Sequence, residues 1–135
     1  MTVTEEIRRA AAGIARRQGL SLVVLFGSAA EGTERPDSDV DIGVRFRGDY
    51  DLSKTLEVQL AVSALSGGRE VDLAVLNRAD PLLMKKIAER CLVLYEDPGA
   101  AAAFRLLAFR RYQDHRRFLA MERDFAAAYV KRIAS

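Results

Sequence analysis

The chain has 135 residues, half of them apolar and 30% charged, with a formal net charge of +2. This length fits a single domain, residues 1–135, and no apolar run approaches the roughly 20 residues that span a bilayer. Cys91 is the one cysteine, which excludes an internal disulfide and a multi-cysteine metal site. The N-terminus does not resemble a signal peptide, so we expect a cytoplasmic protein without a membrane partner.

The first third of the chain predicts a helix followed by a buried strand. Apolar residues recur at helical spacing between Thr2 and Gly19, and a glycine can end a helix there. Residues 20–26, LSLVVLF, form a near-continuous apolar run rich in β-forming side chains, which is typical of a buried strand. Gly27 and Ser28 end this strand before a short polar stretch.

Two later segments alternate between apolar and polar residues and therefore predict strands with one buried face. In residues 38–46, SDVDIGVRF, the apolar residues share one face, while Asp39 and Asp41 share the other. In residues 69–76, REVDLAVL, the apolar residues again alternate, and Asp72 lies on the opposite face.

Three aspartates mark helix starts. Asp51 can cap a helix, and Asp80 and Asp97 each precede a proline, which favours the first helical turn. A short strand, 92–95, separates the last two signals, and nothing breaks the helical pattern over 98–133, which predicts one long helix or two joined helices. The helix that follows Asp51 would carry the apolar residues Leu52, Leu56 and Leu60, and the helix that follows Asp80 would carry Leu82, Leu83 and Ile87.

Helices thus flank a small mixed sheet of three to four strands, an α/β (α+β) class. Residues 1–96 would form the core and 97–135 a helical extension. From Phe104 onward the chain carries eight Lys and Arg against three Asp and Glu, a balance that suits an acidic partner, a nucleotide, a nucleic acid or a solvated helix face. The apolar stripe of this extension would form core, a homo-oligomer interface or a partner interface.

The carboxylates suggest a metal site. Asp39 and Asp41, two residues apart on a strand, would repel each other unless a cation lies between them, and Mg²⁺ takes such oxygen ligands together with substrate phosphates. If the strand of Asp72 pairs beside theirs, three carboxylates could hold two ions, and Asp72 could accept a hydroxyl proton. Gly27 and Ser28 would offer backbone N–H groups and a hydroxyl to a phosphate. Each feature alone also fits a solvated turn or sheet face.

Together these features resemble the signature of the polymerase-β-like nucleotidyltransferases, in which Gly-Ser is followed after ten residues by Asp-x-Asp. In LFGSAAEGTERPDSDVDIGV, Gly27 and Ser28 match the first pair, and Asp39 and Asp41 match the second. Asp72, in EVDLAVL, matches the third carboxylate of the family by its order and strand context. The size resembles the minimal, MNT-type members, specifically the MntA-type antitoxins of HEPN toxins. The resemblance implies transfer of AMP from ATP, with Mg²⁺, to a tyrosine of the toxin, without a need for nucleic acid.

One position departs from the family pattern. Relatives often carry an arginine shortly after Gly-Ser, where this chain has Glu31, and Arg35 or an arginine of the last helix would have to replace it. Two other functions remain open from the sequence. The chain could modify a small molecule, as aminoglycoside nucleotidyltransferases do, or it could silence its partner by binding alone.

Overall fold

The computed structural model describes residues 3–32 and 39–134, apart from the side chains of Val3, Thr4, Glu6, Ala29 and Glu31. Helices and strands alternate along these residues. In chain order they are α1 (Val3–Gln18), β1 (Leu20–Phe26), α2 (Ser28–Glu31), β2 (Val40–Phe46), α3 (Leu52–Ser63), β3 (Val71–Val75), α4 (Pro81–Glu89), β4 (Cys91–Glu96) and α5 (Ala100–Ala134).

The four strands form one mixed sheet in the order β3-β2-β1-β4. β1 is antiparallel to both of its neighbours, β2 and β4, whereas β2 and β3 are parallel. β1 has neighbours on both edges and helices on both faces, which explains why its sequence is almost continuously apolar. The predicted class, a small mixed sheet flanked by helices, is confirmed.

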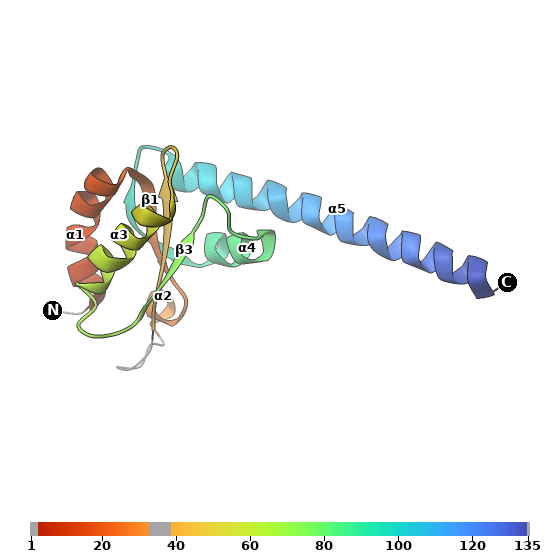
Figure 1. Ribbon diagram of the computed structural model, residues 1–135, viewed down its shortest axis with the longest axis horizontal. Helices are drawn as coiled ribbons and strands as arrows, with labels where there is room; N and C mark the ends of the chain where they lie inside the picture. Colours follow the sequence, from red (N-terminus) through yellow and green to blue (C-terminus); the bar gives the residue numbers. More distant parts are fainter. Residues whose placement is uncertain (1–2, 33–38, 135) are drawn as a thin grey trace.

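Helices cover both faces of the sheet (Figure 1). α1 and α3 pack on one face, around Leu25 and Ile42, and α4 and the start of α5 pack on the other, around Val24 and Leu76. Gly43 of β2 lies on this second face, and a Cβ there would lie 2.9 Å from Cγ2 of Val24 and 3.2 Å from Cδ2 of Leu76. Glycine is therefore needed at this position for the second layer to pack closely.

Two of the three predicted helix starts are confirmed. The Asp51 carboxylate accepts the backbone N–H of Lys54 at 2.8 Å, and the Asp80 carboxylate caps α4 in the same way. The prediction for Asp97 is wrong, because α5 begins only at Ala100. The Asp97 carboxylate instead accepts hydrogen bonds from Arg47 and Tyr95, so it is not available to the helix.

The leucines of α3 do not form its buried face. Leu52 and Leu60 are each 71% exposed, while Val58 and Val62 are buried against the sheet. The helix therefore carries two apolar stripes, and the one that faces the sheet is the valine stripe. In α4, Leu82 is likewise exposed, although Ile87 is buried as the sequence suggested.

Residues 100–134 form one continuous helix, α5, which answers the question left by the sequence. Only its first turns are buried against the sheet, and the rest extends away from the other elements (Figure 1). We call residues 114–134 the projecting segment. Its exposed large apolar side chains are Phe118, Leu119, Met121, Phe125, Tyr129, Val130 and Ile133. No helix in the described part of the chain is long and apolar enough to cross a membrane.

Candidate active site

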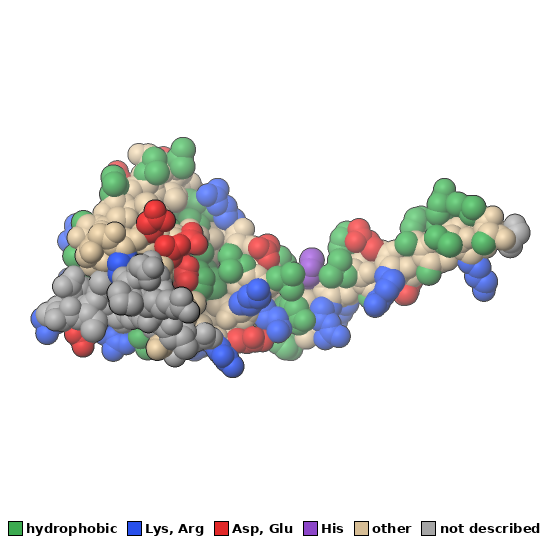
Figure 2. Space-filling model, turned by 90° about the horizontal axis from the view of Figure 1, so that it is seen from below, with side chains coloured by type: hydrophobic (Ala, Val, Ile, Leu, Met, Phe, Trp, Pro, Cys, Tyr) green, Lys and Arg blue, Asp and Glu red, His purple; other side chains and the backbone are tan. Residues whose placement is uncertain are grey.

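Asp39, Asp41 and Asp72 come together at one end of the sheet. β2 and β3 are parallel neighbours, and their register places Asp41 directly beside Asp72. Paired strands lie about 4.8 Å apart, so these two side chains leave the same face as neighbours. Asp39 is exposed and immediately precedes β2. Figure 2 views the molecule from this end and shows acidic side chains gathered there. The strand pairing that the sequence argument required is present.

Gly27 brings the end of β1 against the Asp41 carboxylate. Its φ of +71° lies in the left-handed region that favours glycine. A Cβ at this position would collide with the carboxylate of Asp41, whose Cγ would be only 3.0 Å away. Ser28 follows as the first residue of α2. The two residues of the Gly-Ser pair therefore border the acidic cluster, and no larger residue fits at Gly27 without moving Asp41.

The carboxylates affect one another's ionisation. The pKa of Asp41 is raised, first by burial and then by the negative charges of Asp72 and Asp39. Each of these causes disfavours the ionised form of Asp41 in the folded chain. A cation bound beside Asp41 would favour the ionised carboxylate instead, so the negative charges of the cluster favour cation binding.

The donor set fits Mg²⁺ if the substrate supplies part of its coordination. Among the side chains that the structure describes, no group of three or more His, Cys, Asp or Glu residues is arranged so that it could hold a metal ion by itself. Mg²⁺ in proteins is usually held by only one or two carboxylates, with waters and substrate phosphates completing the shell. Asp41 and its strand neighbour Asp72 offer the one or two carboxylates that such an open arrangement needs.

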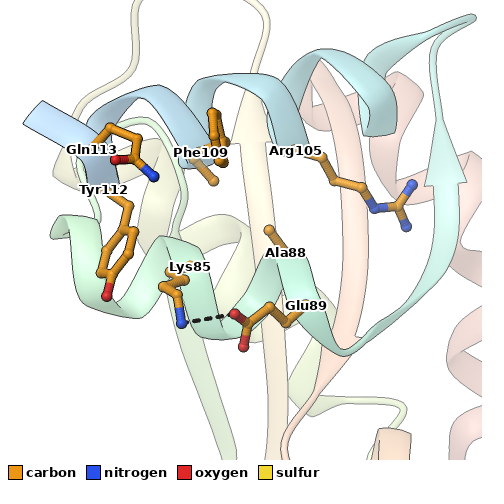
Figure 3. Close-up of a pocket in the computed structure, with 8 residues that line it drawn as sticks. Lys85, Ala88, Glu89, Arg105, Phe109, Tyr112 and Gln113 are labelled. Carbon is orange, nitrogen blue, oxygen red and sulfur yellow. Dashed lines mark ion pairs between the residues drawn. The ribbon is translucent and has the colours of Figure 1, made fainter.

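Two hollows open beside α4. The larger, about 390 Å³, is a mostly apolar groove between α4 and α5, in which Lys85 pairs with Glu89 (Figure 3). The smaller, about 280 Å³, reaches the acidic end of the sheet, because Gly27 forms part of its wall. The residues that line the smaller hollow are Phe26, Gly27, Leu83, Lys86, Glu89 and Arg90.

Sequence reasoning missed Lys86 and Arg90. No local pattern could have indicated them, because their approach to Gly27 depends on how α4 packs over the end of β1. Glu31 stands where relatives often carry an arginine, and its side chain lies outside the described residues. Arg35, one of the predicted substitutes for that arginine, also lies outside them.

Comparisons with known proteins bear on this site. The family model described as "Polymerase beta, Nucleotidyltransferase" matches residues 11–98, a range that contains all five predicted site residues. No curated protein matches the chain. Among solved structures, a minimal nucleotidyltransferase is 29% identical with a TM-score of 0.60, and the match covers 68% of this chain and 95% of that one.

Two toxin–antitoxin structures match over more of the chain. One, a complex with AMP-PNP, is 24% identical with a TM-score of 0.71, and the match covers 92% of this chain and 98% of that one. The other is a tri-AMPylated HEPN toxin of Shewanella oneidensis in complex with an MNT antitoxin, at 21% identity and a TM-score of 0.65, covering 92% and 95%. These likenesses establish a shared fold that extends beyond the residues of the family match.

Proposed function

Because this chain belongs to the polymerase-β nucleotidyltransferase family, we propose that it transfers AMP from ATP to a tyrosine hydroxyl of a partner HEPN toxin and so acts as an antitoxin. The observation that carries this proposal is the position of Asp41, between Gly27 on one side and Asp72 on the other. Further support comes from the two structures of the same fold, one with AMP-PNP and one with an AMPylated toxin.

We assign roles to the five residues from their places at the site. Gly27 and Ser28 lie where the phosphates of the nucleotide would meet the end of β1. Asp39 and Asp41, with Asp72 beside them, would hold Mg²⁺. That ion, when bound, supplies positive charge to the phosphate oxygens and orients the triphosphate. Gly27 lets the phosphates approach the carboxylates closely because it has no side chain.

The transfer needs one proton acceptor and one leaving group. The acceptor hydroxyl oxygen forms a bond to the α-phosphorus, and the bond from this phosphorus to the oxygen that bridges to the β-phosphate breaks. Pyrophosphate leaves with that electron pair, and the hydroxyl proton passes to the Asp72 carboxylate. Asp72 is exposed and lies on β3, an edge strand, so a protein acceptor can reach it.

The projecting segment of α5 is the surface that we assign to the toxin. Its apolar side chains are exposed in the chain alone, and an exposed apolar surface of this kind is typical of an interaction site. A second copy of this chain is the alternative occupant. We place the complex in the cytoplasm, where ATP is available.

The direct test is to incubate the purified chain with labelled ATP, Mg²⁺ and the toxin encoded beside it, and to measure the mass of the toxin. We expect a gain in units of AMP, lost in Asp41→Asn and kept in Asp49→Asn, an exposed aspartate outside the site. If Asp41→Asn still silences the toxin without any mass gain, the chain acts by binding alone. If only a small molecule gains AMP, the acceptor assignment is wrong.

A further inference from the structure

The smaller hollow beside α4 gives the site a cationic side that the sequence did not reveal. We propose that Lys86 and Arg90 bind the β- and γ-phosphates of the donor nucleotide, and therefore the pyrophosphate that leaves. This inference rests on the proposed function and adds two residues to its nucleotide site. Gly27 and Ser28 would bind the same phosphates from the backbone side.

The wall of the hollow connects the two cations to the catalytic end of the sheet. Lys86 lies in the last turn of α4, Arg90 directly follows the helix, and both line the hollow together with Phe26 and Gly27. Gly27 is the same residue that touches the Asp41 carboxylate. A ligand that occupies the hollow therefore lies beside the acidic cluster, whereas the larger groove has no wall residue from β1 or the Gly-Ser pair.

The order of the strands separates the charges along this end of the sheet. Asp72 lies on β3 and Asp41 on β2, Gly27 follows β1, and Arg90 directly precedes β4. From β2 to β4 is two strand spacings, about 10 Å. A triphosphate whose α-phosphate lies at the carboxylates and their metal ion can thus extend its terminal phosphates past Gly27 toward the cations.

Glu89, the acidic residue among the described residues that line the hollow, has a partner of its own. The Glu89 carboxylate lies 2.8 Å from Nζ of Lys85, a residue that lines the larger groove instead (Figure 3). This pairing offsets the negative charge of Glu89. Among the described residues of its wall, Lys86 and Arg90 offer cationic groups that can donate hydrogen bonds to an anionic ligand.

The size of the hollow favours part of a nucleotide over a whole one. Pockets that enclose an entire small ligand are commonly about 300–1,000 Å³. At about 280 Å³, this hollow is below that range. Its cations select the phosphate end of the nucleotide as the part that it takes.

The test compares nucleotides that differ only in their terminal phosphates. The dissociation constants of ATP, AMP and inorganic pyrophosphate would be measured by calorimetry with Mg²⁺, for the full chain and for Lys86→Ala, Arg90→Ala and the double variant. We expect each single variant to bind ATP and pyrophosphate about tenfold more weakly, and the double variant about 100-fold, with AMP changed less than about twofold. Arg9→Ala, an exposed arginine of α1, is the matched control and should bind as the wild type does.

A variant with the opposite expected sign excludes a general loss of structure. Glu89→Gln removes the acidic side chain among the described wall residues, so ATP should bind about two- to threefold more tightly. The inference is overturned if Lys86→Ala and Arg90→Ala bind ATP like the wild type, if AMP weakens as much as ATP, or if Glu89→Gln weakens binding. Absence of ATP binding by the wild-type chain would overturn the proposed function itself, and the inference with it.

Discussion

The two ends of α5 have similar apolar spacing but opposite environments. Phe104, near its start, is 1% exposed because it packs with Leu76 and Met84, whereas Phe125, in the projecting segment, is 76% exposed. A helix that projects alone is only marginally stable in water, because most helical stability comes from packing. The difference teaches that the start of α5 completes the fold, while the projecting segment leaves its apolar side chains exposed, which is why we assign it to a partner.

The largest expected effect tests this comparison directly. Phe104→Ala should lower the free energy of unfolding by about 3–5 kcal/mol, because it leaves a cavity in the layer between the sheet and α5. Phe125→Ala should change it by less than about 0.5 kcal/mol in the isolated chain. Urea unfolding of both variants measures the difference. Equal losses would show that the projecting segment packs within the chain and that the comparison is wrong.

The next effect concerns catalysis and stability at once. Asp41→Asn should reduce AMP transfer at least about 100-fold, since a metal site stabilises the transition state by several kcal/mol. The same variant should be more stable than the wild type at pH 7 without Mg²⁺. The raised pKa of Asp41 means that its contribution to stability is present at low pH and is lost as the pH rises through that pKa.

Thermal unfolding as a function of pH checks the second half of this prediction. The greater stability of Asp41→Asn should disappear in acid, where the wild-type carboxyl is protonated. The affinity of the wild type for Mg²⁺ should rise as the pH increases from that range, because the carboxylate becomes ionised. Asp49→Asn, at the exposed aspartate outside the site, is the control and should alter neither the transfer chemistry nor the unfolding. A variant at Asp41 that is less stable at neutral pH would contradict the electrostatic argument.

A smaller effect is expected on partner binding. Phe125→Asp should weaken toxin binding about 30-fold, the loss typical of an interface hot spot, and leave ATP binding unchanged. Leu52→Asp is the matched control, since Leu52 is an exposed apolar residue of α3. Calorimetry with the purified toxin distinguishes the two surfaces. If Leu52→Asp alone disrupts the complex, the toxin binds at α3 and not at the projecting segment.

Local signals in the sequence predicted much of the fold. The apolar run of β1 and the caps at Asp51 and Asp80 depend on neighbouring residues only, and all three are confirmed. The adjacency of Asp41 and Asp72 could be predicted only on the condition that their strands pair, because the alternation of a strand shows a face and not a neighbour.

The remaining features depend on packing choices that the sequence leaves open. In α3 the leucine and valine stripes both suit a core, and the structure buries Val58 instead of Leu60. Apolar side chains recur along the whole of α5 in the sequence, yet only those of its first turns are buried, because the other elements do not extend farther along the helix. Arg90 is placed at the candidate site by the packing of α4 over β1. The roles of the five predicted site residues remain predictions, and Asp41→Asn tests the one at the centre of the site.

The smallest expected effect lies at the turn that leads into α5. Nε of Arg47 and Oδ2 of Asp97 are 2.7 Å apart, and the hydroxyl of Tyr95 donates to Oδ1 of Asp97 at 2.8 Å. The hydrogen bond from Arg47 is the largest cause that lowers the pKa of Asp97 to about 2. The stabilisation that the ionised Asp97 gains from Arg47 and Tyr95 is therefore present above the ordinary pKa of an aspartate and is lost as the pH falls toward 2. Because the pair is solvent-exposed, its loss should matter little at neutral pH.

Arg47→Ala should raise the pKa of Asp97 toward that of an ordinary aspartate, which a carboxyl-carbon NMR titration between pH 6 and pH 2 would follow. The variant should unfold slightly more easily at pH 7 and lose that deficit as Asp97 becomes protonated. Arg45→Ala, two residues away on β2, is the control and should leave the titration of Asp97 unchanged. An unaltered Asp97 pKa in Arg47→Ala would contradict the assignment of the Arg47 hydrogen bond as the main cause of the lowered pKa.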